Sequence, residues 1–122
     1  MIPTLIVDDE EDVRSLVRLV VEAANEGLYV SGEAADGEEA IEHWREHRPV
    51  AVILDQRMPG MSGLDVARHM LAEKPDQGII LFSAFLDRNT REAAQEIGVR
   101  VCLDKTQVSR LPEELWALAP PA

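Results

Sequence analysis

Cysteine is nearly absent from this sequence, since Cys102 is the only one among 122 residues. A single thiol cannot form an internal disulfide, which excludes a small secreted domain held together by cross-links. Aromatic residues are also scarce, at 4%. The core must therefore be built from Val, Leu, Ile and Ala, a composition that is common where helices pack on a parallel sheet.

Long apolar segments and basic residues are also in short supply. No apolar run approaches the roughly 20 residues that a membrane-spanning helix needs, and Met1–Val7 is too short for the apolar part of a signal peptide. Twelve basic residues stand against 23 acidic ones, for a formal net charge of −11. Such a charge repels nucleic acid and anionic membranes. We expect a soluble, cytoplasmic protein that binds neither of them and whose charge suits a metal ion or a basic partner.

Two hydrophobic periods alternate along the chain, which is long enough for one domain. Five short apolar runs are typical of buried strands: Thr4–Val7, Leu28–Gly32, Ala51–Leu54, Ile79–Phe82 and Val99–Leu103. Stretches with helical spacing follow each run, marked by Val13, Leu16, Val17, Val20, Val21 and Ala24, then Ala40, Ile41 and Trp44, then Leu64, Ala67 and Leu71, then Ala93, Ala94 and Ile97, and last Leu115 and Leu118. This alternation predicts an α/β fold of the doubly wound (βα)₅ type, in which helices cover both faces of a parallel five-stranded sheet.

Polar residues and glycines predict where these helices begin and end. The expected cap residues are Asp36, Ser62 and Asn89, each three positions before an acidic residue. Gly27 and Gly98 stand where helices are expected to stop. Pro112, followed by two glutamates, is typical of the first turn of a helix.

Acidic, hydroxyl and basic residues follow the predicted strands. Asp8 and Asp9 come after the first strand, Asp55 after the third, Ser83 after the fourth and Lys105 after the fifth. The carboxyl ends of parallel strands meet at one edge of a sheet, where ligands bind. Crowded carboxylates repel one another unless a cation joins them, and Mg²⁺ prefers oxygen ligands.

A hydroxyl and an ammonium beside such a cation complete a receptor for a phosphoryl group. Asp55 is then the candidate nucleophile, which forms an aspartyl phosphate. Taken singly, each residue has a structural explanation, such as a helix-capping role for Asp9. It is the whole set, each member at a strand end, that points to this chemistry.

At these residues the chain resembles the receiver domain of two-component response regulators. Leu5–Glu10 resembles the first strand and acidic pair of that family, and Asp55–Gly63 matches its D-x-x-M-P-x-x-x-G motif. Ser83 followed by Ala84 resembles the conserved hydroxyl and small residue, and Lys105 the invariant lysine. The resemblance implies a flavodoxin-like three-layer sandwich with strand order 2-1-3-4-5. We assign residues 1–119 to the receiver domain and residues 120–122 to a tail or the start of a linker.

The resemblance also implies a metal site. Asp9 and Asp55 would bind Mg²⁺ directly, with Mn²⁺ as a substitute, together with the backbone carbonyl of Arg57. Asp8 would act largely through water.

The implied function is signalling rather than enzymatic turnover, because the domain catalyses only its own phosphorylation and dephosphorylation. A histidine kinase or phosphotransfer protein would supply the phosphoryl group, and Ser83 and Lys105 would hold it. The face made by the fourth helix, fifth strand and fifth helix would then change its partners, pairing with an output protein or a second copy.

Two residues depart from the family pattern. Cys102 stands where an aromatic residue usually lies, three before the lysine, and Thr106 stands where a proline usually follows a cis peptide bond. A cis bond before a non-proline residue costs about 3 kcal/mol, so we expect a trans link. The segment before Pro112 is also long and the last helix short. We expect normal phosphorylation and a modified output face, with Cys102 as a small buried residue.

Four further side chains have competing interpretations. Arg57 and Phe85 lie two positions beyond Asp55 and Ser83, where their bulk could screen an acyl phosphate from water; the alternative is ordinary surface variation. His43 and His47 have the spacing of a helical metal pair. They lie off the apolar face, so we expect them to be solvated.

Other functions fit the residues less well. A phosphohydrolase of the haloacid dehalogenase type needs an aspartate two positions after its nucleophile, where this chain has Arg57. A flavodoxin-like cofactor binder needs a loop that cradles phosphate, and the acidic segment Asp8–Asp12 repels it. A docking module that works without phosphorylation stays open, as does the position of the domain at the front of a longer, for example DNA-binding, response regulator.

Overall fold

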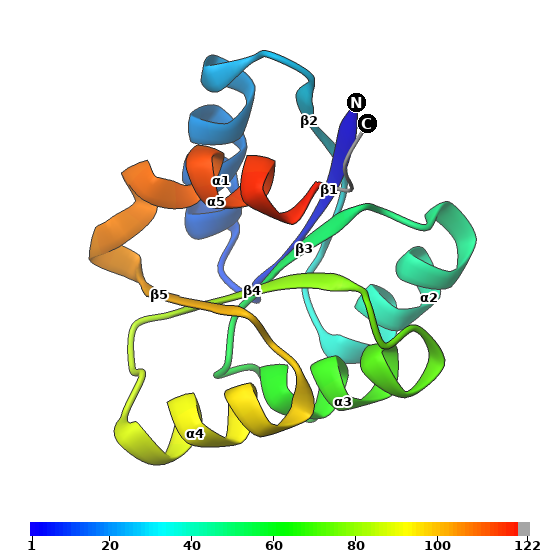
Figure 1. Cartoon of the computed structure of the whole chain (residues 1–122). Coiled ribbons are helices and arrows are strands. Elements are labelled where there is room, and N and C mark those ends of the chain that lie inside the picture. The colour runs from blue at the N-terminus through cyan, green and yellow to red at the C-terminus, as the bar shows by residue number, and fades with distance from the viewer. Residues whose placement is uncertain (120–122) are drawn as a thin grey trace.

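Strands and helices alternate through residues 1–119, the part of the chain that this computed structural model describes (Figure 1). The strands are β1 (Ile2–Val7), β2 (Leu28–Ala34), β3 (Ala51–Leu54), β4 (Gly78–Ser83) and β5 (Val101–Asp104). The α-helices are α1 (Glu11–Ala24), α2 (Gly37–His47), α3 (Gly63–Glu73), α4 (Arg88–Ile97) and α5 (Leu111–Leu118). The expected tail at residues 120–122 lies outside the described part.

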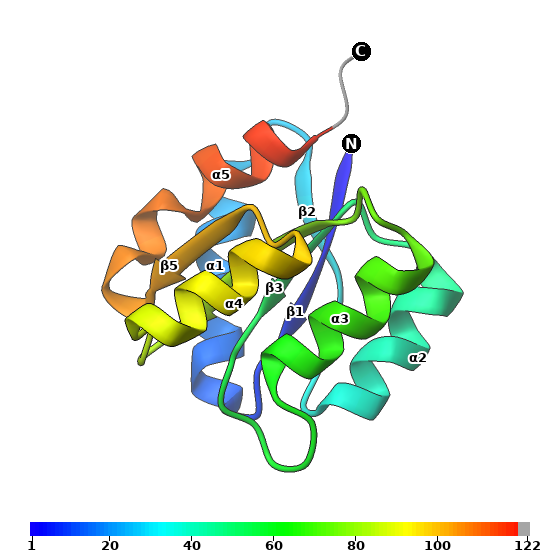
Figure 2. The same cartoon turned by 60° about the horizontal axis from the view of Figure 1, so that its bottom comes forward.

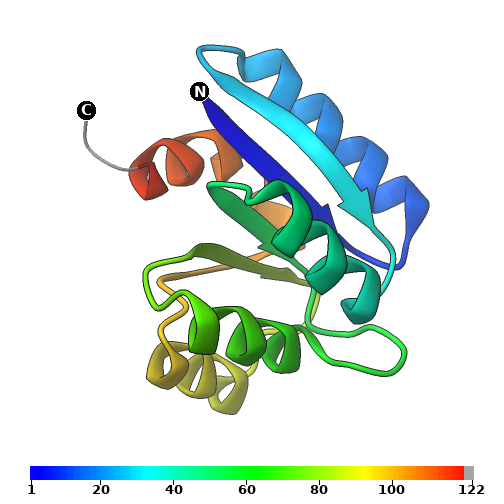
Figure 3. The ribbon, with the colours of Figure 1, turned by 90° about the vertical axis from the view of Figure 1, so that its right-hand side faces the viewer.

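The five strands form one parallel sheet in the order β2-β1-β3-β4-β5. Helices α1 and α5 cover one face of the sheet, and α2, α3 and α4 cover the other (Figures 2 and 3). The predicted doubly wound, three-layer fold and its strand order are therefore confirmed. None of the helices within residues 1–119 has the length and apolar character that crossing a membrane requires.

Alternating side chains of the strands fill two cores, one on each face of the sheet. In β1, Leu5 and Val7 pack under α2 and α3, whereas Ile6 packs under α1 and α5. The central strands β3 and β4 are buried along their whole length. Both cores consist mainly of aliphatic residues, as the shortage of aromatics predicted, and they make the sheet a rigid base for the residues at its edge.

The expected helix starts are correct for two helices and wrong for a third. The Asp36 carboxylate accepts a hydrogen bond from the Glu39 N–H at 2.9 Å, and Ser62 forms a reciprocal capping box at the start of α3. Asn89, however, lies inside the first turn of α4. That helix begins earlier because Asp87 accepts the Thr90 N–H at 2.7 Å.

The glycines expected to end helices also give a mixed result. Gly98 ends α4 in the left-handed region, with φ of 104°, as predicted. The first helix ends earlier than Gly27, at Ala24. Asn25 and Glu26 already take positive φ values and turn the chain toward β2.

The segment after β5 departs from a simple strand-to-helix link. A 3₁₀ helix runs over Lys105–Arg110, closed at its start by hydrogen bonds between Asp104 and Gln107. No cis peptide bond occurs within residues 1–119, so the link before Thr106 is trans, as expected. Helix α5 has only 8 residues and carries Pro112 in its first turn, which confirms the long connection and the short last helix.

Candidate functional site

The carboxyl ends of β1, β3, β4 and β5 bring the predicted residues to one edge of the sheet. The Lys105 ammonium lies 2.9 Å from the Asp8 Oδ2 atom and 3.6 Å from the Asp55 Oδ2 atom. Ser83 is the last residue of β4 and is paired with Asp104 of β5, next to Lys105. Residues that are up to 97 positions apart therefore share one site.

These side chains are buried although they are polar or charged. The exposed fraction is 2% for Asp8, 4% for Asp55 and 1% for Ser83. Burying a carboxylate is costly unless it is paired or hydrogen-bonded. Lys105 pairs with both acids, so its one positive charge is shared between two negative charges.

This excess of negative charge affects the pKa of the Asp55 carboxylate. Its pKa is raised, chiefly by burial and then by the nearby charge of Asp8; the attraction of Lys105 and the nearby Arg57 N–H oppose the shift. A nucleophilic carboxylate must be ionised. An additional cation at this edge would favour that state.

The Lys105 ammonium shows the complementary shift. Burial favours loss of its proton, but the hydrogen bond to Asp8 and the attraction of Asp55 and Asp8 outweigh burial, so the pKa of Lys105 is raised. It is therefore a fixed positive charge at neutral pH. A fixed cation beside the nucleophile suits a reaction in which an anionic group arrives.

Carboxylates able to hold a metal ion lie at the start of α1. One oxygen each from Asp8, Asp9 and Glu10 lies within 4.8 Å of the other two. The Asp8 Oδ1 atom also accepts the Glu10 N–H at 2.9 Å, which fixes the turn. Glu10 was not among the predicted metal ligands, although it directly follows the acidic pair in the sequence. Asp55 does not join this cluster at that distance and faces Asp8 from β3.

Ser83 provides the clearest sign that the site is built for a ligand. Its Oγ atom is buried and makes no hydrogen bond within the described residues, whereas most buried polar atoms in proteins have a partner. A phosphoryl oxygen is a suitable acceptor for this hydroxyl. Together, the orphan hydroxyl, the fixed ammonium of Lys105 and the crowded carboxylates fit a phosphoryl group and a divalent cation.

The two ends of the loop that joins Asp55 to α3 are in contact with each other. The Gln56 side chain accepts the Leu64 N–H at 2.8 Å. A Cβ atom on Gly63 would lie 2.2 Å from the Asp55 carbonyl oxygen, so only glycine fits there. This close approach explains the glycine that ends the motif beginning at Asp55, and it fixes the backbone beside the nucleophile.

Two side chains from different loops meet beside the site. The Arg57 guanidinium carbon lies 4.3 Å from the centre of the Phe85 ring, in the range of a cation–π contact. Arg57 belongs to the loop between β3 and α3, and Phe85 belongs to the loop between β4 and α4. Their proximity was not predictable from the sequence.

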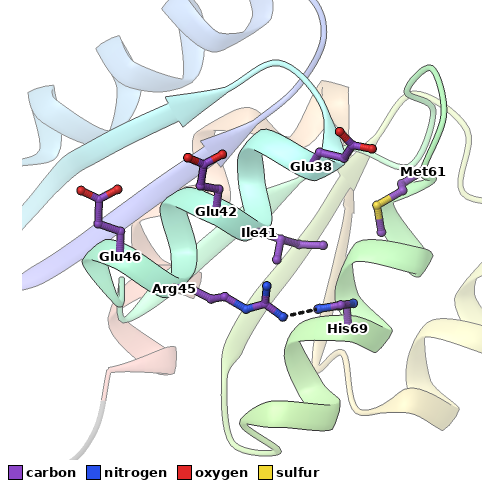
Figure 4. Close-up of a pocket in the computed structure, with 7 residues that line it drawn as sticks. All are labelled: Glu38, Ile41, Glu42, Arg45, Glu46, Met61 and His69. Carbon is purple, nitrogen blue, oxygen red and sulfur yellow. Dashed lines mark hydrogen bonds between the residues drawn. The ribbon is translucent and has the colours of Figure 1, made fainter.

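A separate groove lies between α2 and α3 (Figure 4). It has a volume of about 720 Å³ and is lined by Glu38, Ile41, Glu42, Arg45, Glu46, Met61 and His69. Arg45 reaches across it to His69 at 2.7 Å. None of the strand-end residues lines this groove, so it is separate from the site.

The two histidines of α2 differ from each other. His47 is exposed, as expected, but His43 is partly buried against Gly32. Burial, followed by the nearby His47, lowers the pKa of His43. The two rings stack with their centres 4.3 Å apart. The expectation that both are solvated is therefore wrong for His43, which a simple helical-face argument could not place against β2.

Comparisons with known proteins agree with this geometry. The family model described as "Response regulator receiver domain" matches residues 4–115. Response regulator GacA of Pseudomonas syringae is 40% identical over 81 residues, which cover 66% of this chain and 37% of that protein. Chemotaxis protein CheY of Thermotoga maritima is 34% identical over 112 residues, which cover 91% of this chain and 92% of CheY.

Solved structures show the same arrangement of elements. The response regulator domain of Thermotoga maritima CheB has a TM-score of 0.89 at 23% identity, covering 99% of both chains. A LuxR-family two-component response regulator from Aurantimonas has a TM-score of 0.90 at 28% identity, covering 97% of this chain and 84% of that one. The first of these likenesses concerns the fold alone.

Proposed function

Because the chain belongs to the family of response regulator receiver domains, we propose that it is a phosphorylation-dependent receiver whose acceptor is Asp55. The observation that carries this proposal is the surroundings of Asp55. Its buried carboxylate lies 3.6 Å from the Lys105 ammonium, and Ser83 beside it has a hydroxyl without a partner in the described residues. A phosphoryl group on Asp55 would use both.

The transfer begins at the Asp55 carboxylate. One of its oxygens attacks the phosphorus of a phosphohistidine on a histidine kinase or phosphotransfer protein. The new O–P bond forms as the P–N bond breaks, and the imidazole nitrogen keeps the electron pair and takes a proton from solvent. Lys105 and the Ser83 hydroxyl stabilise the negative charge on the transferred oxygens. The signal ends by hydrolysis: water attacks the phosphorus, the bond between phosphorus and the Asp55 oxygen breaks, and inorganic phosphate leaves.

A divalent cation, Mg²⁺ or its substitute Mn²⁺, would supply charge neutralisation for the transferring group. Asp9, Asp55 and the Arg57 carbonyl would hold it directly, and Asp8 through water. Glu10 adds a third carboxylate to the cluster at the start of α1. Neutralising these acids would also lower the pKa of Asp55 and keep its nucleophile ionised.

The output is proposed to pass through the face of α4, β5 and α5 to a partner protein or a second copy of the domain, in the cytoplasm. The chain spans 37% of the length of the Pseudomonas regulator, so an attached effector domain is compatible with this role. The domain itself, with its net charge of −11, is not proposed to bind nucleic acid.

A docking role without phosphorylation is the second candidate. The half-buried Cys102 and the 3₁₀ helix after Lys105 favour it, because both occupy the output region. A pure docking module, however, has no need of the buried acids and the orphan hydroxyl.

The test is incubation of the protein with Mg²⁺ and acetyl phosphate, followed by intact-protein mass spectrometry. We expect the mass of one phosphoryl group to be added to the wild type and not to Asp55→Asn. Omitting Mg²⁺ should abolish the gain. A wild type that gains no mass under these conditions would support the docking role instead.

A further inference from the structure

Arg57 is a cation beside the site with no acidic partner. It makes no ion pair and no side-chain hydrogen bond within the described residues, and its guanidinium rests on the ring of Phe85 at 4.3 Å. Phe85 itself is 61% exposed. A cation–π contact at such an exposed position is a weak interaction. The Arg57 side chain is therefore held loosely.

The position of Arg57 links the acceptor to the start of α4. Its backbone N–H lies beside the Asp55 carboxylate and opposes the rise in the pKa of that group. The pKa of Asp87 is lowered mainly by its hydrogen bonds to Thr90, and the charge of Arg57 adds to that shift. Asp87 is the residue that caps α4. Arg57 thus connects three features: its backbone lies beside the nucleophile, and its guanidinium lies on the Phe85 ring and near the cap of α4.

Phosphorylation changes the charge that Arg57 faces. The carboxylate of Asp55 carries one negative charge, whereas a phosphoryl group brings about two and three acceptor oxygens. A guanidinium matches phosphate oxygens with paired, charge-assisted hydrogen bonds, which are much stronger than an exposed cation–π contact. In the phosphorylated protein, Arg57 should therefore bind the phosphoryl oxygens in preference to the Phe85 ring.

We propose that Arg57 is a phosphoryl-binding residue that leaves the Phe85 ring when Asp55 is phosphorylated, and that its departure frees Phe85 and the start of α4. This inference rests on the proposed function. It assigns a signalling role to two side chains that meet only in the folded chain.

The residue that departs from the family pattern, Cys102, leaves a role for a different link between the acceptor and α4. Cys102 is half-buried and packs against the core under α2, α3 and α4. A thiol has no ring that can rotate to follow the hydroxyl of Ser83. Phe85 supplies an aromatic side chain in the loop that leads from Ser83 to α4, and Arg57 connects that ring to the acceptor.

The test uses the fact that the chain has two phenylalanines, Phe82 and Phe85. In protein with ¹³C-labelled phenylalanine rings, Phe82 is 2% exposed and serves as the internal reference. Unphosphorylated Arg57→Gln protein defines the ring signals of Phe85 without a cation above it. In wild type with Mg²⁺ and acetyl phosphate, we expect the Phe85 signals to move toward that reference, with shifts of the Arg88–Thr90 amides.

The control variant is Phe85→Leu, which keeps an apolar side chain and removes the ring. Phosphoryl occupancy is measured by mass in every sample. At equal occupancy, the Arg88–Thr90 amide shifts should be clearly smaller in Phe85→Leu than in wild type. Unmoved Phe85 ring signals in phosphorylated wild type would overturn the inference, and so would a full amide response in Phe85→Leu. Absence of phosphoryl mass in wild type would contradict the proposed function itself.

Discussion

At the scale of single residues, Asp55 carries its charge in an unfavourable place. Its carboxylate is 4% exposed and faces Asp8, and together these raise its pKa. The folded protein therefore binds a proton at Asp55 more readily than the unfolded chain does. Stability from this group is greatest at low pH and decreases as pH rises past the ordinary pKa of Asp, near 3.9, toward the higher folded value.

Asp55→Asn should therefore stabilise the protein without metal at neutral pH. We expect a gain in the free energy of unfolding, because the neutral amide removes the buried negative charge that is responsible for the raised pKa of Asp55. Lys105 keeps Asp8 as a partner at 2.9 Å, so its charge is not left alone. Urea unfolding at a series of pH values measures the gain, which should shrink as pH falls toward about 4. A variant that is less stable than wild type at pH 7 would contradict the prediction.

Phe85 is the residue whose bulk is predicted to limit water at the acyl phosphate. Phe85→Ala removes both the ring and its contact with Arg57. We expect dephosphorylation to be about 2–5-fold faster, which corresponds to roughly 0.5–1 kcal/mol in the barrier, because the smaller side chain gives water freer access to the acyl phosphate. The decay of phosphorylated protein after removal of acetyl phosphate gives the rate. An unchanged rate would mean that Phe85 is ordinary surface variation.

At the scale of elements, apolar periodicity was sufficient to place every strand and helix, but not every boundary. Short apolar runs such as Ala51–Leu54 are typical of a central strand of a parallel sheet, and the structure buries this one along its whole length. Cap residues are less decisive because Asp87 and Asn89 are two positions apart and both can cap a helix. The structure selects Asp87 through the Thr90 N–H.

The start of α4 can be tested with this pair of neighbouring residues. Asp87→Ala removes the side chain that caps the helix and should destabilise the protein by about 1 kcal/mol. Asn89→Ala is the matched control, because Asn89 lies exposed in the first turn, and it should change stability by less than about 0.5 kcal/mol. Thermal or urea unfolding of both variants measures the difference. Equal effects, or a larger one for Asn89→Ala, would restore Asn89 as the cap.

At the scale of the whole molecule, the sheet determines how much of the site could be predicted. Asp8, Asp55, Ser83 and Lys105 follow directly from strand ends, because parallel strands deliver their carboxyl ends to one edge. The contact between Arg57 and Phe85 could not be predicted, since it depends on the path of two loops. Glu10 could have been predicted, since it directly follows the acidic pair in the sequence and its carboxylate lies close to those of Asp8 and Asp9.

The net charge of −11 favours binding of a cation, as the acidic cluster at the site does. A metal ion that binds the folded protein and not the unfolded chain stabilises the fold by mass action, so Mg²⁺ should stabilise the wild type, and less so Asp55→Asn. The same charge disfavours direct contact with nucleic acid, which agrees with the proposed output through a protein partner.

The most direct measurement locates the phosphoryl group on the chain. Protein treated with Mg²⁺ and acetyl phosphate is reduced with borohydride, which converts an aspartyl phosphate to homoserine, and its peptides are then sequenced by mass spectrometry. The prediction is conversion at Asp55, with Asp8 and Asp9 unchanged. Conversion at another aspartate, or at none in protein that has gained the mass of a phosphoryl group, would contradict the assignment of Asp55 as the acceptor.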